Sequence, residues 1–291
     1  MIPVLSVALM RASDAQTIES GTPSRELMRR AGEGLVDAVD RSGMGGWRPP
    51  VAIVCGSGNN AGDGYVVAAI LARRGIACTV FLLSDRFSED GAFFAGEARA
   101  AGVPFSAWSE GGSLAGYATV VDCLFGTGFR GEVEGPAADA ILAINESGAF
   151  VVSADINSGL DGDTGMAECC VVSDLTVAIG GYKPGHFLGM AKDVMREKVD
   201  LDIGIRPQEK PYFLFEASDA ARAFPPRKNF SNKSTYGYVA LIGGSAQYTG
   251  AIRLAALANA AMRSGAGVVK VASPASICPQ IAPSILEATL F

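Results

Sequence analysis

Short apolar runs alternate with amphipathic helical segments through the middle of this chain. The apolar runs lie at 51–55, 78–83, 119–125, 149–156 and 174–179, and helical patterns fill three of the intervals, at 63–74, 90–101 and 136–147. Continuous apolar strands separated by helices indicate a parallel sheet that is covered on both faces. The sequence therefore predicts a doubly wound, Rossmann-like α/β domain, although it does not predict the order of the strands.

The two ends of the chain depart from this alternation. Ahead of the first run, the pattern predicts two helices, one capped by Ser6 and one starting at Pro23 and Ser24. Beyond residue 205, four prolines and mixed charges indicate a domain boundary, and a new strand–glycine loop–helix–strand unit follows. We expect a first domain over 1–210, a linker over 211–229 and an incomplete second α/β unit over 230–291.

The composition is that of a globular protein with an acidic balance. Hydrophobic residues make up 49% of the 291 positions and charged residues 19%, which is enough apolar surface for a sizeable core. The net charge of −6 argues against nucleic acid or an anionic membrane as the main partner. It still allows a phosphate-bearing small molecule, because backbone amides at helix N-termini bind anions without basic side chains.

The features of the N-terminus and the spacing of the cysteines both favour a cytoplasmic protein. No apolar run approaches the length of about 18 residues that a membrane span needs, and the N-terminus lacks the basic stretch and cleavage site of a signal peptide. The six cysteines show no C-x-x-C spacing, so we expect buried, reduced thiols. His186 is the single histidine, which excludes a histidine-rich metal site.

A run of small and amide residues, GSGNNAGDG at 56–64, separates the first predicted strand from its helix. A plain strand-to-helix connection needs about 2–6 residues, so we expect a ligand to lie against this backbone. The run fits the loose G-x-G-x-x-A dinucleotide fingerprint, with Asp85 at the end of the next strand. Taken alone, it leaves open an NAD(P)-dependent oxidoreductase, or a turn built from Asn59 and Asn60.

Polar residues also follow the later strands. Asp122 lies inside the end of the third strand, Asp155 and Ser158 follow the fourth, and Lys183 lies in a K-P-G turn after the fifth. In an open α/β sheet, ligands bind beyond the carboxyl ends of the strands. Each residue also has a structural interpretation, as a satisfied carboxylate, a turn cap or a solvated lysine. Their common position nevertheless predicts a single site.

Four motifs in order, G-x-G-N-N-x-G-D-G, V-V-D-x-L-F-G-T-G-x-x-G, D-I-x-S-G-L-D-x-D-T-G and K-P-G, closely resemble the NAD(P)H-hydrate epimerase family. The resemblance runs through residues 1–205 and includes the helix ELMRRAGEG and the closing DIGI. The linker and the segment GYVALIGGSAQYTGAIRLAALANAAMRSGAGVVKV resemble the start of an ADP/ATP-dependent NAD(P)H-hydrate dehydratase, a ribokinase-like domain.

The resemblance implies that the chain interconverts the R and S forms of hydrated NADH and NADPH (NADHX and NADPHX). The hydrate is a hemiaminal, whose epimerisation needs an acid–base group beside C6. Asp155 is the first candidate for that group, and Lys183 is the second, either as its partner or as a charge that tunes the pKa of Asp155. The resemblance also implies a potassium ion held by Asn60, Asp122 and Ser158, which suit a hard monovalent cation. The residues expected to contact the substrate are Asn59, Asn60, Ala61, Gly62, Asp63, Gly126, Thr127, Gly128, Phe129, Arg130, Gly131, Glu132, Asp155 and, in the dehydratase-like part, Ala251.

Two residues depart from the family pattern. Ala61 stands where the family usually has Gly, so substrate packing there is expected to differ, and Asn157 stands where it usually has Pro, which is expected to loosen a turn. We expect no dehydratase activity from residues 230–291, since they supply only the start of that domain, and the natural product continuing past Phe291 is the alternative. The first two helices are candidates for a homodimer contact. An oxidoreductase and a non-enzymatic nucleotide-binding protein stay open as alternatives.

Overall fold

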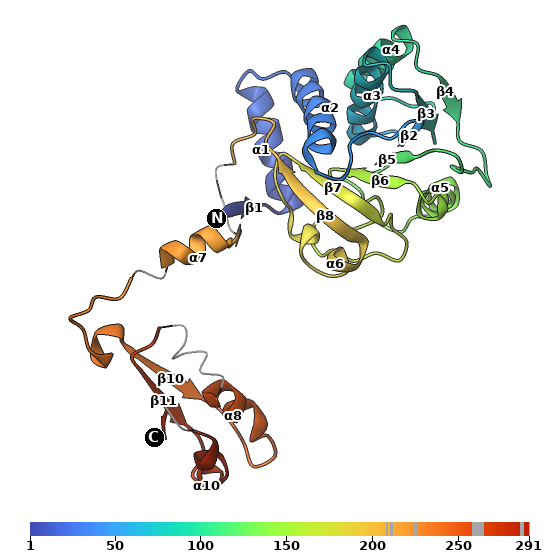
Figure 1. The fold of residues 1–291 in the computed structure, drawn as a ribbon. Helices are drawn as coiled ribbons and strands as arrows, with labels where there is room; N and C mark the ends of the chain where they lie inside the picture. The colour runs from blue at the N-terminus through green and yellow to red at the C-terminus, as the bar shows by residue number, and fades with distance from the viewer. Residues whose placement is uncertain (208, 210–211, 224–225, 258–264, 286–287, 291) are drawn as a thin grey trace. The chain divides into compact units, whose positions relative to one another are not determined.

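The computed structural model describes residues 1–291 except 208, 210–211, 224–225, 258–264, 286–287 and 291 (Figure 1). The chain divides into two compact units, Met1–Leu214 and Phe215–Phe291. This division falls inside the segment 211–229 that the sequence marks as a linker. The two units are described separately below.

The first unit contains a sheet of seven parallel strands in the order β4-β3-β2-β5-β6-β7-β8, which confirms the doubly wound α/β class. The strand order reverses between β2 and β5, which places the topological switch point there. The strands are β2 (Val51–Cys55), β3 (Cys78–Leu82), β4 (Phe105–Ala107), β5 (Thr119–Cys123), β6 (Phe150–Ala154), β7 (Ser173–Ile179) and β8 (Met195–Leu201).

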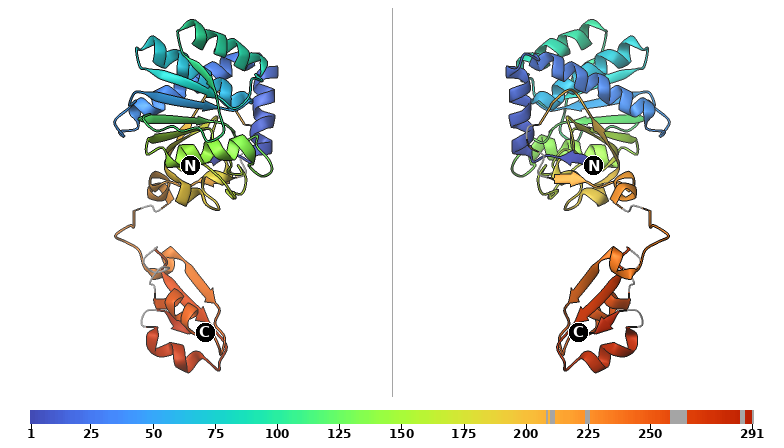
Figure 2. Two further views of the ribbon diagram at one scale, coloured as in Figure 1. Left: turned by 90° about the vertical axis from the view of Figure 1, so that its right-hand side faces the viewer. Right: turned by 90° about the vertical axis from the view of Figure 1, so that its left-hand side faces the viewer.

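Helices cover both faces of this sheet (Figures 1 and 2). Alternate strand residues such as Ile53 and Val121 join the core under α2, α3 and α4, while Val54 and Val120 join the core under α5. This division follows from the two-residue period of a strand. The helices are α1 (Val7–Glu19), α2 (Ser24–Arg41), α3 (Asn59–Arg73), α4 (Glu89–Ala100), α5 (Gly135–Glu146), the short α6 (Ala191–Val194) and the 3₁₀ turn η1 (Pro184–His186).

The predicted cap of the first helix is confirmed, and a second cap comes from far along the chain. Leu9 donates its backbone N–H to Ser6 Oγ at 3.2 Å. The N–H of Val7 is donated to Asp163 Oδ1 at 2.8 Å. Helix α1 is therefore fastened to the loop between β6 and β7, although the two segments are 156 residues apart.

Helix α3 begins earlier than the sequence predicts. It starts at Asn59 rather than at residue 63, with Gly58 as its N-cap in an extended conformation. Gly and Asn are weak helix formers, which is why the pattern suggested a loop there. Packing of this first turn against α2 and the sheet overrides that preference, since Ala61 is buried in the main core.

The first unit also has a two-stranded antiparallel sheet. Strand β1 (Ile2–Val4) pairs with β9 (Tyr212–Leu214), and Ile2 lies opposite Leu214. The second unit contains a parallel sheet in the order β10-β11-β12, with the strands β10 (Tyr238–Ile242), β11 (Val268–Ala272) and β12 (Thr289–Leu290). Its helical segments are α7 (Ala217–Ala223), η2 (Lys233–Tyr236), α8 (Gly250–Leu257), α10 (Cys278–Ile281) and η3 (Ala282–Ser284).

The sheet of the second unit is thinly covered. A small apolar cluster forms around Ile252, Val271 and Ile281. By contrast, Tyr238 is 61% exposed and Ile242 is 83% exposed, although both belong to β10. Parallel strands are ordinarily buried on both faces. None of the helices in the described part of the chain combines the length and the apolar character that crossing a lipid bilayer requires.

Candidate functional site

A pocket of about 570 Å³ opens beyond the carboxyl ends of β2 and β5, at the switch point of the sheet. Its walls come from α1, from the start of α2, from residues 57–60 and Asp63, from residues 124–129 and from Ile203 and Ile205. Asp155 and Lys183 also line it. The strand order therefore brings Asp155 and Lys183, which the sequence placed at separate strand ends, into one pocket. Asp122 and Ser158 are not among its lining residues.

A buried ion pair lies in this pocket. Lys183 Nζ lies 2.5 Å from Asp155 Oδ1, and the lysine side chain is 1% exposed. The ammonium also donates to the carbonyl of Ile179 at 2.7 Å. Asp155 Oδ2 accepts hydrogen bonds from the backbone N–H and from the hydroxyl of Thr127, both at 2.9 Å. Both carboxylate oxygens of Asp155 are thus held in place.

The backbone of Asp155 has an unusual conformation. Its φ is 66°, and it is the only residue other than glycine with a positive φ in the described ranges. Such a conformation costs on the order of 1–3 kcal/mol and persists only where the surroundings impose it. The backbone N–H of Asp155 is donated to the carbonyl of Val177 at 2.8 Å, which helps to hold this conformation. Strained residues cluster at functional sites, so the conformation of Asp155 agrees with its position in the pocket.

Charges around Asp155 keep its carboxyl ionised. Burial opposes ionisation, but the Lys183 ammonium and the hydrogen bonds from Lys183 and Thr127 outweigh it, so the pKa of Asp155 lies below its ordinary value. His186 is buried nearby, and burial together with the Lys183 charge lowers the pKa of the imidazole to about 4. His186 is therefore neutral near pH 7.

Asp63 lies in the same pocket in a different environment. It is 8% exposed, and no hydrogen bond or ion pair reaches its carboxyl in the part of the chain that the structure describes. Burial, the negative charge of Asp155 and that of Asp14 raise the pKa of Asp63 well above its ordinary value. One pocket thus contains two carboxyl groups whose pKa values are shifted in opposite directions.

Three residues are expected to hold potassium. Asn60 lies at the start of α3, Asp122 near the end of β5, and Ser158 in the turn after β6. Asp122 is fully buried and accepts hydrogen bonds from the N–H and the hydroxyl of Ser158, from Ser153 Oγ and from the N–H of Leu124. Burial raises the pKa of Asp122 against the effect of these hydrogen bonds. Asn60 Oδ1 and Nδ2 are buried and have no hydrogen-bond partner in the described residues.

The N-terminus of α3 faces the pocket. Ser57, Gly58 and Asn59 line it, and no side chain caps the helix. Uncapped N–H groups and the helix dipole make such an end favourable for anions. Arg11 of α1 lies on the opposite wall and donates from Nη2 to the carbonyl of Gly128 at 2.9 Å.

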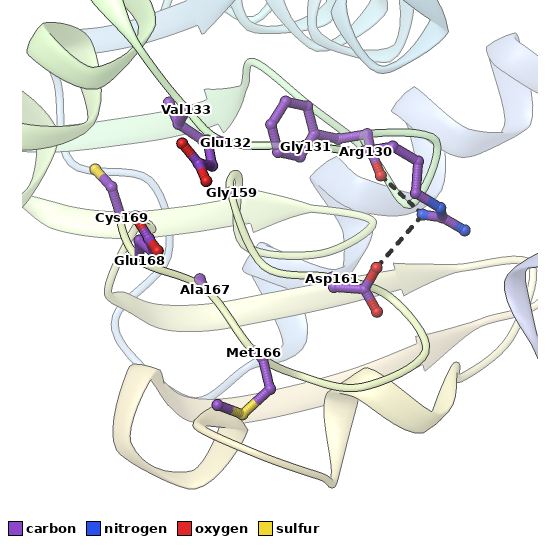
Figure 3. Close-up of a pocket in the computed structure, with 11 residues that line it drawn as sticks. Arg130, Gly131, Glu132, Val133, Gly159, Asp161, Met166, Ala167, Glu168 and Cys169 are labelled. Atoms are coloured by element: carbon purple, nitrogen blue, oxygen red, sulfur yellow. Dashed lines mark hydrogen bonds and ion pairs between the residues drawn. The ribbon is translucent and has the colours of Figure 1, made fainter.

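The segment expected to contact substrate at 126–132 divides between two pockets. Gly126, Thr127 and Gly128 line the pocket with Asp155, whereas Arg130, Gly131 and Glu132 line a second pocket of about 270 Å³. Phe129 lines both. In the second pocket, Arg130 reaches across to Asp161 on the facing loop, with 3.8 Å between Nη1 and Oδ2 (Figure 3).

Three other expected contacts lie outside both pockets. Ala61 is 1% exposed and packs in the main core, and Gly62 lies under Met28, with which an added Cβ would collide. Ala61 thus packs in the core and lines neither pocket, and the altered substrate packing expected there stays a prediction. Ala251 lies on α8 of the second unit and is exposed.

Asn157 does not loosen its turn. Its side-chain amide donates to the carbonyls of Val171 and Val194 at 2.8 and 2.9 Å, and its Oδ1 accepts from Thr176 Oγ1 at 2.6 Å. These bonds tie the turn after β6 to three other segments. The expectation of a looser turn was therefore wrong, because a hydrogen-bonded asparagine replaces the rigidity of a proline.

Sequence reasoning missed the contribution of the N-terminal helices to the pocket. Met10, Arg11 and Asp14 of α1 line it, as do Leu27 and Met28 of α2. The apolar stripe of α2 predicted burial but not a pocket wall. The Arg11–Gly128 contact spans 117 residues. No local pattern in the sequence signals such a contact.

A doubly wound parallel sheet with a polar pocket at its switch point places this unit in the class of α/β domains whose ligand sites lie at that point. Residues 24–185, more than half of the chain, match the family described as YjeF-related protein N-terminus, and the chain belongs to that family. Residues 239–288 match a second family, described as NAD(P)H-hydrate dehydratase.

Several curated relatives share the name of a bifunctional enzyme. The Bifunctional NAD(P)H-hydrate repair enzyme Nnr of Methanothermobacter thermautotrophicus is 37% identical over 92% of this chain and 52% of its own length. The proteins of the same name from Archaeoglobus fulgidus and Escherichia coli are 38% and 35% identical, over 86% and 84% of this chain and 51% and 48% of their own lengths. The chain spans about half the length of these relatives.

A solved structure supports the fold. The crystal structure of the yeast protein YNL200c matches with a TM-score of 0.59 and 23% identity. The match covers 74% of this chain and 97% of the yeast chain. At this level of identity, the likeness concerns the fold alone.

Proposed function

We propose that the first unit epimerises the R and S forms of hydrated NADH and NADPH. Its membership of the YjeF-related family and its similarity to enzymes named for NAD(P)H-hydrate repair support this activity. The observation that carries the proposal is Asp155, which lies in the pocket with its backbone strained and both carboxylate oxygens fixed.

The chemistry of the hydrate explains why such a residue is needed. Its C6 carbon bears a hydroxyl next to the ring nitrogen, so protonation of that hydroxyl lets the nitrogen lone pair expel water. The resulting iminium accepts water from either face, which exchanges the R and S forms. An acid–base group beside C6 speeds both proton transfers. The Asp155 carboxylate is ionised and suited to take the proton from the incoming water.

The pocket offers binding groups for the rest of a dinucleotide. The uncapped N-terminus of α3 at Gly58 and Asn59 suits the diphosphate, since its N–H groups face the pocket. Arg11 supplies a positive charge on the opposite wall. The side chains of Leu27, Met28 and Ile203 offer an apolar surface for a planar ring.

We further propose that Asn60, Asp122 and Ser158 hold a potassium ion. The donors are an amide oxygen, a hydroxyl and one carboxylate, which suit a hard cation. The buried Asn60 Oδ1 lacks a hydrogen-bond partner in the described residues, which fits an oxygen reserved for a ligand. A bound cation would compensate the charge of buried Asp122 and would help to fix the start of α3 beside the substrate.

Three narrower statements stay predictions. We propose that residues 1–291 do not dehydrate the hydrate by themselves, because β10 is largely exposed where a parallel strand needs cover on both faces. A homodimer through α1 and α2 and a cytoplasmic location stay predictions as well. Light scattering tests the homodimer, and cell fractionation of the native protein tests the cytoplasmic location.

Chiral chromatography of purified NADHX tests the epimerase proposal. One pure epimer is incubated with and without the protein, and the proposal expects equilibration far above the uncatalysed rate. The Asp155→Asn variant should lose most of this rate. Hydride transfer to a carbonyl substrate would favour the oxidoreductase alternative. Tight binding of the hydrates without turnover would favour a nucleotide-binding protein.

A further inference from the structure

Two carboxyl groups from different elements line the pocket with opposite surroundings. Asp155, after β6, is bonded to Lys183 and Thr127 through both oxygens. Asp63, in α3, is more than nine-tenths buried, lines the same pocket and has no hydrogen-bond or ion-pair partner in the described residues. Its carboxyl oxygens are not among the fully enclosed unpartnered atoms of the described residues, so the carboxyl is open to the pocket, where a ligand can bond to it.

The charges that act on Asp63 are those of Asp155, in the turn after β6, and Asp14 of helix α1. Cys123 of β5 is also close enough to interact with Asp63. Arg11 of α1 and Asp90 of α4 line the same pocket. Lys183 is committed to Asp155, Arg11 to the carbonyl of Gly128, and Asp90 to Ser24 and Arg25. Helix α2 contributes the apolar residues Met28 and Ala31. Thus no basic side chain among the described residues forms an ion pair with Asp63.

We propose that Asp63 is a second catalytic residue. It exchanges a proton with the C6 hydroxyl of the hydrate, while Asp155 exchanges one with the water that bonds to C6 to form the opposite epimer. This inference rests on the proposed epimerase function. It adds a role for Asp63 beyond contact with the substrate, since it assigns the residue to the reacting hydroxyl.

The proton balance closes over one epimerisation. Asp63 in its acid form protonates the C6 hydroxyl, the C6–O bond breaks, and water leaves as the ring nitrogen forms the iminium. A second water bonds to C6 and gives its proton to the Asp155 carboxylate. The pair ends with Asp63 ionised and Asp155 protonated, which is the form that processes the opposite epimer in reverse. Exchange with solvent water, in which Asp155 releases a proton and Asp63 takes one up, restores the starting form. No oxidant, reductant or further reactant is needed.

The raised pKa of Asp63 and the lowered pKa of Asp155 agree with this division of roles. Paired carboxyl groups whose surroundings push their pKa values apart are typical of acid–base pairs. A pair that carries one proton is active at intermediate pH and loses activity when both groups are ionised or both are protonated. The rate should therefore depend on pH as a bell-shaped curve whose two limbs belong to the pair.

The Asp63→Asn variant tests the proposal, because asparagine matches the shape of the protonated carboxyl but transfers no proton. We expect kcat for either epimer to fall about 100-fold or more, the Kd for NADHX to change less than threefold, and the basic limb of the pH profile to disappear. The Asp63→Glu variant, which keeps an ionisable group, should recover part of kcat and the basic limb. Circular dichroism confirms that both variants are folded.

A spectroscopic measurement checks the resting protonation without turnover. The infrared band of a protonated carboxyl should be present in the wild type near pH 7 and should be diminished in Asp63→Asn. A wild-type minus Asp63→Asn difference spectrum without this band would overturn the role of Asp63 as the acid. So would an Asp63→Asn variant that keeps its kcat, or one that loses affinity but keeps the basic limb. An inactive wild type would instead refute the epimerase proposal itself.

Discussion

His186 lies 2.8 Å from the backbone carbonyl oxygen of Asp155 through its Nε2. Its Nδ1 accepts the backbone N–H of Lys183 at 3.0 Å, so the proton of the neutral ring is on Nε2 and is donated to Asp155. The imidazole thereby connects the backbones of the two residues whose side chains form the buried ion pair. We infer that His186 positions Asp155 and Lys183 and does not itself transfer protons.

The lowered pKa of His186 predicts a loss of stability in mild acid. Its pKa is about 4 in the folded state and about 6.5 in the unfolded state, so between these values the unfolded state binds more protons. Unfolding free energy should therefore fall as pH drops from about 6.5 towards 4, by up to about 3 kcal/mol from this residue. Urea unfolding across this pH range should show that the unfolding free energy of His186→Gln depends less steeply on pH than that of the wild type. An equally steep dependence in that variant would contradict the assignment.

Removing one member of the Asp155–Lys183 pair should destabilise the fold more than removing both. The variant Asp155→Asn leaves an uncompensated ammonium in a buried position, which costs about 3–5 kcal/mol. Lys183→Met leaves a buried carboxylate and should also destabilise. The double variant should recover part of the loss, because no buried charge is left. A double-mutant cycle from urea unfolding measures this coupling, and strictly additive effects would argue against a buried pair.

Gly126 lies where a side chain would displace the Asp155 carboxylate. A Cβ at this position would lie 2.9 Å from Asp155 Oδ2. We expect Gly126→Ala to lower the epimerisation rate about 100-fold through misplacement of Asp155. Gly96→Ala is the matched control, since Gly96 lies on an exposed part of α4 with no atom within 4 Å of an added Cβ. It should keep full activity and gain about 0.5–1 kcal/mol of stability.

Replacing potassium should reveal the proposed ion site. At about a hundredfold excess over its Kd, a bound ion stabilises by about 3 kcal/mol, so exchange of potassium for tetramethylammonium should lower Tm by roughly 5–10 °C. Asn60→Leu should abolish this difference, and it should cost little stability in tetramethylammonium because the Asn60 amide has no hydrogen-bond partner in the described residues. An identical Tm in both salts would refute the potassium proposal.

The strand pattern predicted the sheet and the meeting of the polar residues at its carboxyl edge. Asp122 lies at the end of β5 and Ser158 follows β6, and their side chains are hydrogen-bonded because β5 and β6 are neighbours. That outcome needed only the period of the apolar runs and the rule for parallel sheets. The strained backbone conformation of Asp155 could not be predicted from the sequence, since φ depends on the hydrogen bonds and packing around the residue.

The remainder of the site depends on contacts between distant segments. Arg11 and Asp14 lie on a helix that the sequence predicted, but only packing brings that helix to the pocket. The early start of α3 at Asn59 likewise follows from packing, which overrides the weak helix propensity of Gly and Asn. The unpaired state of Asp63 is also a property of its surroundings and has no signature in the sequence.

The pairing of β1 with β9 makes the two ends of the first unit neighbours. Ile2 lies directly opposite Leu214 in that antiparallel ladder, which places their Cα atoms about 5 Å apart. A few residues would suffice to join these ends, so the unit is suited to circular permutation and to insertion into a loop of a host protein. Shortening the unit at residue 205 would instead remove β9 and expose β1 as an unpaired edge, which favours association between chains.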